Sequence, residues 1–171
     1  MTAIFFSKQN IIDLSLASIA KLKPLAQKAA FRRARYCLHR SHSDSVQEMI
    51  IAMHMSTYVR PHRHGTNISE SFHMIEGELD IILFRENGDI DQRVEMGDLQ
   101  SGKSIIYRMN CNIWHMVIPK TKYVIFHETT TGPFEPINAD FPEWAPLETD
   151  TVGISKLFKY INNHKILKDL V

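Results

Sequence analysis

The chain has 171 residues, 44% of them hydrophobic, which is enough to bury the core of one globular domain. Its 20 basic and 19 acidic residues give a net charge of +1, a balance that excludes a large field for nucleic acid or an anionic membrane. The two cysteines form no spacing motif, which favours a reducing, cytoplasmic compartment over a disulfide scaffold. Without a signal-peptide pattern or a long apolar run, we expect neither export nor a membrane anchor.

Residues 1–35 are expected to form a helical cap on a barrel. Apolar residues recur at near-helical spacing over residues 13–30, and Pro24 is expected to divide this run into two short helices. A basic cluster with three arginines follows at residues 31–35. We interpret this cluster as a solvated face with apolar neighbours, and an anion contact near the mouth of the barrel is the alternative.

Short apolar or alternating runs separated by turn residues fill residues 36–130. They predict strands at residues 36–40, 48–55, 58–64, 70–77, 78–84, 92–96, 104–109, 114–119 and 123–129. Many short strands with frequent turns favour an antiparallel sandwich or barrel, and a double-sheet jelly roll closes most of the open edges.

Two further segments follow the predicted barrel. Residues 131–150 are rich in proline and aromatic residues, and we expect them to wrap the barrel and bury their aromatic side chains. Residues 151–171 place apolar side chains near helical spacing among lysines, which predicts an amphipathic helix interrupted at Asn162 and Asn163. Its expected role is packing on its own barrel, a homodimer contact is the alternative, and a membrane-surface helix is disfavoured.

Two histidines, His62 and His64, stand two residues apart in a predicted strand. Side chains two apart on a strand face the same side, so both imidazoles are aimed at one point. Residues 65–69 have turn composition, and Glu70 opens the next predicted strand, so a hairpin brings a carboxylate to the two imidazoles. His73 lies three residues from Glu70 and faces the opposite side of a regular strand, so Glu70 is chosen as the ligand.

His115 precedes an apolar run at residues 116–118, and a strand elsewhere in the barrel would supply it as the fourth ligand. Imidazole and carboxylate ligands together suit zinc, iron, manganese, nickel or copper. The competing interpretation is an exposed hairpin with ordinary polar histidines, in a chain that has nine of them. The acid and the glycine that follow at workable spacing, Glu70 and Gly77, favour the metal site.

These residues resemble the first cupin motif, in which HxH is followed by a short gap, a glutamate, six residues and a glycine. Here five residues separate His64 from Glu70, one more than usual, and six separate Glu70 from Gly77. The second cupin motif, G…PxGxxH, is represented by Gly97 and by NCNIWH at residues 110–115, with asparagines in place of the proline and of the second glycine.

Among cupin-fold proteins, the chain resembles the WbuC family of metalloproteins, over about residues 10–148. Five blocks occur in the family's order, at residues 32–50, 58–64, 70–84, 113–115 and 132–146. The resemblance implies a cupin barrel holding one metal, in bacterial proteins often encoded among genes for surface polysaccharide (O-antigen) synthesis.

The expected fold class is therefore mainly β, a cupin-type double-stranded β-helix (jelly-roll) barrel with N-terminal helices and a C-terminal helix. The expected cofactor is one divalent transition metal, such as zinc, iron, manganese or nickel. The predicted ligands are His62, His64, Glu70 and His115. The expected partner is a small molecule, a sugar or nucleotide sugar, and neither nucleic acid nor a membrane.

Two functions from different classes remain open. One is an enzyme that performs metal-assisted isomerisation, epimerisation or oxygen chemistry on a small polar molecule, because three imidazoles and a carboxylate leave a coordination position for substrate. The other is a non-catalytic metal-bound cupin that binds a sugar or regulates a pathway enzyme. Strand parity places Tyr58 and Arg60 on the face of the histidine pair as candidate catalytic residues, and Arg60 suits a carboxylate or phosphate. Tyr107 and His127 are weaker candidates on other strands.

Overall fold

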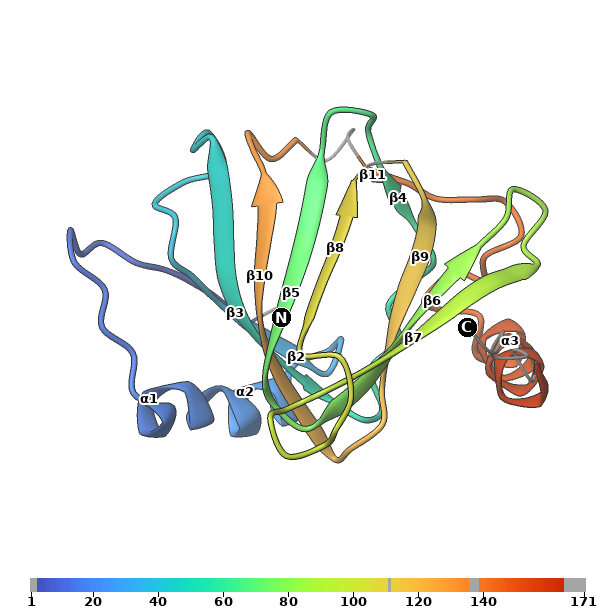
Figure 1. Ribbon diagram of the computed structural model, residues 1–171, viewed down its shortest axis with the longest axis horizontal. Coiled ribbons are helices and arrows are strands. Elements are labelled where there is room, and N and C mark those ends of the chain that lie inside the picture. Colours follow the sequence, from blue (N-terminus) through green and yellow to red (C-terminus); the bar gives the residue numbers. More distant parts are fainter. Residues whose placement is uncertain (1–2, 111, 136–138, 165–171) are drawn as a thin grey trace.

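Two β-sheets face each other across a shared core in the computed structural model, which describes residues 3–110, 112–135 and 139–164 (Figure 1). Its strands are β1 (Ala3–Phe6), β2 (Arg33–Cys37), β3 (Val46–His54), β4 (Arg63–His64), β5 (Ser69–Glu76), β6 (Glu78–Phe84), β7 (Ile90–Gly97), β8 (Ile106–Asn110), β9 (Trp114–Pro119), β10 (Tyr123–Thr131) and β11 (Ala139–Asp140). Its helices are α1 (Leu16–Ala20), α2 (Leu22–Lys28) and α3 (Thr151–Asn163). The large sheet has the order β1-β2-β3-β10-β5-β8, the small sheet has the order β7-β6-β9, and β4 pairs with β11. The predicted mainly β barrel with helices at both ends of the chain is confirmed.

Alternate residues of both sheets line the interior of the barrel. Ile51 of β3, Phe126 of β10 and Ile81 of β6 are fully buried and belong to one hydrophobic cluster. Because side chains two apart on a strand share a face, this cluster fixes which residues of each strand point inward. On each strand, the residues an even number of positions from these core residues therefore face the interior.

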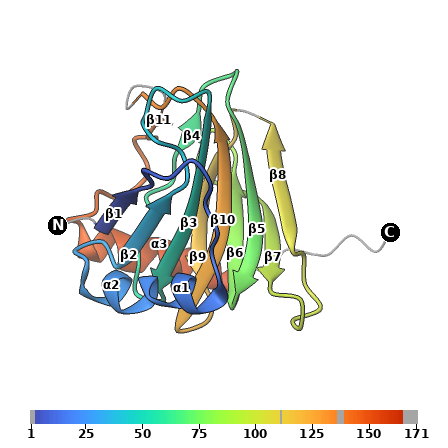
Figure 2. The ribbon, with the colours of Figure 1, turned by 90° about the vertical axis from the view of Figure 1, so that its left-hand side faces the viewer.

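The helices α1 and α2 pack on the outer face of the large sheet, against β2 and β3 (Figure 2). Ile19, Leu22 and Ala26 of the helices form one buried cluster with Ala34 of β2 and Ala52 of β3. The small side chains of the strands let the helices approach closely and remove their apolar faces from water.

The break between these helices lies at Lys21, so the prediction that Pro24 separates them is wrong. Lys21 both ends α1 and caps α2, which places Pro24 at the third residue of α2. The N–H groups of a helix's first turn have no intrahelical partner, so a proline that lacks its N–H is tolerated there.

Most predicted strands are present, with one exception that matters for the site. Of residues 58–64, only Arg63 and His64 form a strand, because Pro61 has no N–H for a ladder and the preceding backbone is irregular. Two short strands, β1 and β11, were not predicted. They depend on pairing with β2 and β4, which lie far from them in the sequence.

The proline-rich segment after β10 buries only part of its aromatic surface. Trp144 packs on Phe84 with ring centroids 5.0 Å apart, as predicted. Phe134 and Phe141 are 48% and 49% exposed, so the expectation that they are buried is wrong. Residues 136–138 lie outside the described part of the chain.

The helix α3 packs on the outer face of the small sheet. Ile161 is buried among side chains of β6 and β9, with Leu157 and Phe158 beside it. The predicted helix is therefore confirmed for residues 151–163, and it ends at the two asparagines; residues 165–171 lie outside the described part. Within the described residues, no helix is long and apolar enough to cross a membrane.

Replacing Asp150 by alanine is expected to destabilise the protein by about 1 kcal/mol. Its carboxylate accepts a hydrogen bond from Gly153 N at 2.9 Å and caps the N-terminus of α3. Thermal unfolding should show a melting temperature lower by about 2–4 °C. The neighbouring variant Thr149→Ala, at an exposed position, serves as the control, and equal melting of both variants would contradict the capping role.

Candidate metal centre

The backbone at His62 and the backbone at His64 are held by two different strands. His62 N donates to His115 O at 3.0 Å, and His115 N donates to His62 O at 2.8 Å, which ties residue 62 to β9. His64 in β4 pairs with Ala139 of β11. These long-range pairings replace the regular strand that the sequence predicted before residue 63. They also replace the predicted hairpin, because β4 and β5 lie in different sheets and do not pair with each other.

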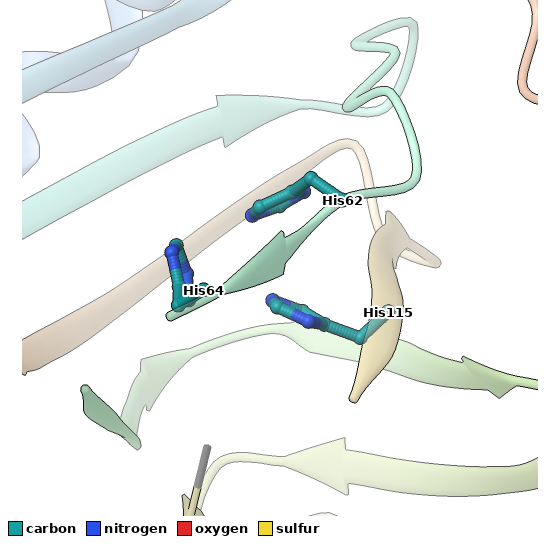
Figure 3. A group of neighbouring side chains, drawn as sticks. All are labelled: His62, His64 and His115. Atoms are coloured by element: carbon teal, nitrogen blue, oxygen red, sulfur yellow. The ribbon is translucent and has the colours of Figure 1, made fainter. Parts of the chain in front are cut away.

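The three histidines point toward one another (Figure 3). His115 shares the inward parity of Val117 on β9 and is 1% exposed. One ligand atom each of His62, His64 and His115 lies within 4.8 Å of the other two. Nitrogen atoms bound to one ion at about 2.1 Å stand up to about 4.2 Å apart, so small side-chain rotations close this group on an ion.

Backbone carbonyls fix which ring nitrogen faces the centre. His62 Nδ1 donates to Arg60 O at 2.9 Å, and His115 Nδ1 donates to Ile113 O at 2.9 Å. In a neutral imidazole the other nitrogen, Nε2, then carries a free lone pair. A hydrogen bond from the second ring nitrogen to a carbonyl is the usual support of a metal-ligating histidine.

Glu70 contacts two of the three histidines. It has the inward parity of Phe72 on β5 and is 4% exposed. Its Oε1 lies 3.3 Å from His64 Nε2, and its Oε2 lies 3.1 Å from His115 Nε2. Within the described residues, Glu70 Oε2 and His115 Nε2 are buried without a hydrogen-bond partner.

Burial and mutual charge set the protonation of this group. Burial, together with the neighbouring His115 imidazole, lowers the pKa of His62 to about 3, so His62 is neutral at physiological pH. Burial opposes the charged form of His115, but the Glu70 carboxylate outweighs it and raises the pKa of His115. Burial disfavours ionised Glu70 as well, yet His115 and His64 hold the pKa of Glu70 well below its usual range.

Glu128 is a further carboxyl group of the interior, and it was not predicted from the sequence. On β10 it has the inward parity of Phe126. Burial, followed by the negative charge of Glu70, raises the pKa of Glu128 to about 7. Such a group can hold or release a proton near neutral pH. One signal in the sequence could have identified Glu128: it is an acidic residue at an inward-facing position of an apolar strand.

Replacing Glu128 by glutamine is expected to stabilise the metal-free protein at alkaline pH. The pKa of Glu128 is 4.5 ordinarily and about 7 in the folded protein. Between pH 4.5 and pH 7 the unfolded chain has therefore lost this proton while the folded protein still holds it, so stability falls as pH rises. The glutamine variant lacks this loss, and its gain at pH 8 is on the order of 1 kcal/mol. Thermal unfolding in the presence of a chelator at pH 4.5 and pH 8 measures the effect; a gain of equal size at both pH values would contradict it.

The candidate catalytic residues Tyr58 and Arg60 bind the segment that follows β11. The Tyr58 hydroxyl donates to Pro146 O at 2.9 Å, and Arg60 Nε donates to Ala145 O at 3.2 Å. The irregular backbone before residue 63 removes the parity on which both candidates rested. Both side chains are therefore engaged with the wrapping segment, and neither contacts the histidine group through a hydrogen bond in the described residues.

Of the two weaker candidates, Tyr107 faces the interior and His127 faces outward. Tyr107 stacks on Phe72 with centroids 6.0 Å apart, and burial, followed by the charge of Glu70, raises the pKa of Tyr107 to about 12. His127 packs edge-on against His73, with centroids 5.6 Å apart, on the other face of the large sheet. The prediction that His73 and Glu70 face opposite sides of β5 is confirmed.

Asn112 explains how the second motif keeps its geometry without a glycine. It adopts a φ of +46° just before β9. Asparagine enters this left-handed region more readily than most residues with a side chain. The turn that delivers His115 is therefore compatible with the asparagine that replaces the motif's glycine.

Several solved structures are similar to this chain. Protein SO0799 from Shewanella oneidensis is 11% identical with a TM-score of 0.53, over 75% of this chain and 79% of its own. An uncharacterised conserved protein with a double-stranded β-helix domain from Klebsiella pneumoniae is 12% identical with a TM-score of 0.52, over 80% of this chain and 99% of its own. The cupin domain of Cnp3 from Schizosaccharomyces pombe is 13% identical with a TM-score of 0.44, over 58% of this chain and 64% of its own.

The topology and the first two likenesses define the class: the chain folds as a cupin-type double-stranded β-helix. A family model described as "Domain of unknown function (DUF6016)" matches residues 14–96. This span includes His62, His64 and Glu70 and ends before His115. No curated protein matches the chain.

Proposed function

We propose that this chain binds one divalent transition metal through His62, His64, His115 and Glu70. The observation that most strongly supports the proposal is the buried pair Glu70 Oε2 and His115 Nε2, which lie 3.1 Å apart and lack a hydrogen-bond partner among the described residues. Because His115 Nδ1 donates to a carbonyl, the two atoms present lone pairs to each other when His115 is neutral. A cation between them satisfies both, and without one only protonation of His115 does so.

The donor set fits the proposed ion. Three imidazoles and one carboxylate suit zinc, iron, manganese, nickel or copper, and the second ring nitrogen of two of the imidazoles, His62 and His115, is held by a carbonyl. The first-row order of affinities leaves the choice of ion to metal supply. A metal so bound polarises a carbonyl or phosphoryl oxygen and lowers the pKa of a water ligand. The neutral state of His62 keeps its Nε2 available for binding throughout the physiological pH range.

We further propose that the chain is an enzyme acting on a small polar molecule rather than a non-catalytic binding protein. Glu128, with its pKa near 7, supplies a proton donor or acceptor in the same interior as the metal ligands. The resemblance to the WbuC family supports a sugar or nucleotide sugar as the substrate, and a cytoplasmic bacterial role in surface polysaccharide synthesis. Isomerisation, epimerisation and oxygen chemistry are the reactions that such a site supports.

Elemental analysis of untagged protein, purified without added metal or chelator, tests the metal proposal. About one metal per chain is expected, and the His62→Ala/His115→Ala double variant should lose it. No metal in either protein would overturn the proposal. If metal is bound, incubation with a panel of nucleotide sugars then separates the two function classes. Turnover that Glu128→Gln abolishes while metal content stays constant supports the enzyme, and binding without turnover supports the non-catalytic alternative.

A further inference from the structure

Two arginines of β2 face the interior of the barrel. Arg33 and Arg35 alternate with Ala34, which is buried on the outer face against the helices. Their parity is that of Cys37, which belongs to the interior cluster. Of the three arginines in the basic cluster, only Arg32 is exposed. The interpretation of this cluster as a solvated face therefore holds for Arg32 and is wrong for the other two.

Among the described residues, neither guanidinium group has a hydrogen bond or an ion pair, and that of Arg33 lies over the Phe31 ring, 5.6 Å from its centroid. The Nε atoms of Arg33 and Arg35 are buried with no hydrogen bond, and among the described residues no carboxylate lies within 4.0 Å of either side chain. Burial, followed by the like charge of Arg35, lowers the pKa of Arg33 to about 10. Two like charges held in a partly buried interior without a carboxylate in direct contact are unfavourable for folding. Positions that cost stability in this way are typical of binding sites.

The register of the large sheet places these arginines on the same inner face as Glu70, further along the strands. Arg35 pairs with Ile51, which in turn pairs with Phe126 of β10. One inward step further along β10 is Glu128, and the next inward residue, Thr130, pairs with Glu70. The charge of Glu128 interacts with both arginines and also with Glu70 and His64. Both arginines and the metal ligands therefore face one interior.

We propose that Arg33 and Arg35 bind the carboxylate or phosphate group of the small molecule that reaches the metal centre. Guanidinium groups bind both oxyanions through charge-assisted, often bidentate hydrogen bonds. With a divalent ion bound, the positive charges of the ion and of the two arginines exceed the negative charges of Glu70 and Glu128, even when both are ionised. An anionic ligand restores the balance. This inference rests on the proposed function and specifies the substrate class.

Calorimetric titration with inorganic phosphate and with malonate, each against the full chain, tests the proposal. The metal content of every sample is measured first. The Arg33→Gln/Arg35→Gln variant is expected to bind the preferred anion at least about ten-fold more weakly, with unchanged metal content. Tighter binding of phosphate than of malonate assigns a phosphate-bearing ligand, and the reverse assigns a carboxylate. Arg32→Gln, which makes the same substitution at an exposed neighbour and removes one positive charge, should bind as the wild type does.

Thermal unfolding separates a ligand-binding role from a structural role. Without anion, the double variant should melt at the same temperature as the wild type or higher, because it loses two unpaired charges. The preferred anion should raise the melting temperature of the wild type and of Arg32→Gln, but not that of the double variant. Equal anion binding by wild type and double variant, or no anion binding by the wild type, would overturn the inference. A protein that binds anions through these arginines but carries no metal would instead overturn only the metal proposal.

Discussion

Replacing His115 by alanine is expected to lower the metal content of the purified protein at least roughly ten-fold. His115 is the most deeply buried of the three histidines, and its ring is fixed by the bond from Nδ1 to Ile113 O and by the position of β9. Removal of this imidazole leaves Glu70 Oε2 without a facing nitrogen and breaks the ligand set on the side of the small sheet. His64→Ala is expected to have a similar effect, because its Nε2 faces Glu70 Oε1 at 3.3 Å. Elemental analysis of each variant measures the loss.

His73→Ala provides the matched control for these variants. His73 lies on β5 three residues from Glu70 but is exposed on the opposite face, so its removal should leave the metal content unchanged. Circular dichroism of each variant establishes that the barrel is intact. Full metal retention by both His64→Ala and His115→Ala would show that the histidine group is not the site of binding.

Replacing Gly77 by alanine is expected to destabilise the protein by about 3 kcal/mol or more, through backbone strain and steric overlap together. Gly77 joins β5 to β6 with a φ of +79°, a conformation that residues with a Cβ rarely adopt. A Cβ atom there would lie 2.4 Å from Thr121 Oγ1 and 2.5 Å from Tyr123 O. The second contact is with backbone of β10, which cannot move without disturbing the large sheet. Thermal unfolding should show a melting temperature lower by about 6–12 °C.

Gly102→Ala measures the conformational part of this effect alone. Gly102 has a similar φ of +70°, but a Cβ at this position meets no heavy atom within 4 Å. Its replacement should therefore cost only the conformational term, about 1 kcal/mol. If both variants melt at the same temperature, the close packing of Gly77 against β10 is not what stabilises this turn.

The sequence by itself determined the class of the fold and the chemical types in the site, because both depend on local patterns. Alternation of apolar and polar residues identified most strands, and strand parity correctly assigned Glu70 to one face of β5 and His73 to the other. Turn composition correctly placed a turn between His64 and Glu70, but the predicted hairpin is wrong, because β4 pairs with β11 and β5 pairs with β8 and β10. Such inferences require only neighbours within a few residues, which a single sequence contains.

Assigning side chains to a face by strand alternation was unreliable where the backbone is not a regular strand. Tyr58 and Arg60 were assigned to the face of the histidine pair, yet Pro61 interrupts the strand and both side chains bind the wrapping segment. The break between the first two helices was likewise misplaced, because a proline in a helix's first turn resembles a helix breaker in the sequence. For Tyr58 and Arg60 the outcome depended on contacts with a distant segment of the chain.

Only the tertiary structure decided which charged residues face the metal ligands. A basic cluster has the same composition on a surface and in an interior, and the packing of α1 and α2 on Ala34 is what directs Arg33 and Arg35 inward. Glu128 gained its raised pKa from burial and from Glu70, which lies on another strand. Burial and electrostatic interaction depend on distances across the sheet, and these distances are fixed only when the strands are paired.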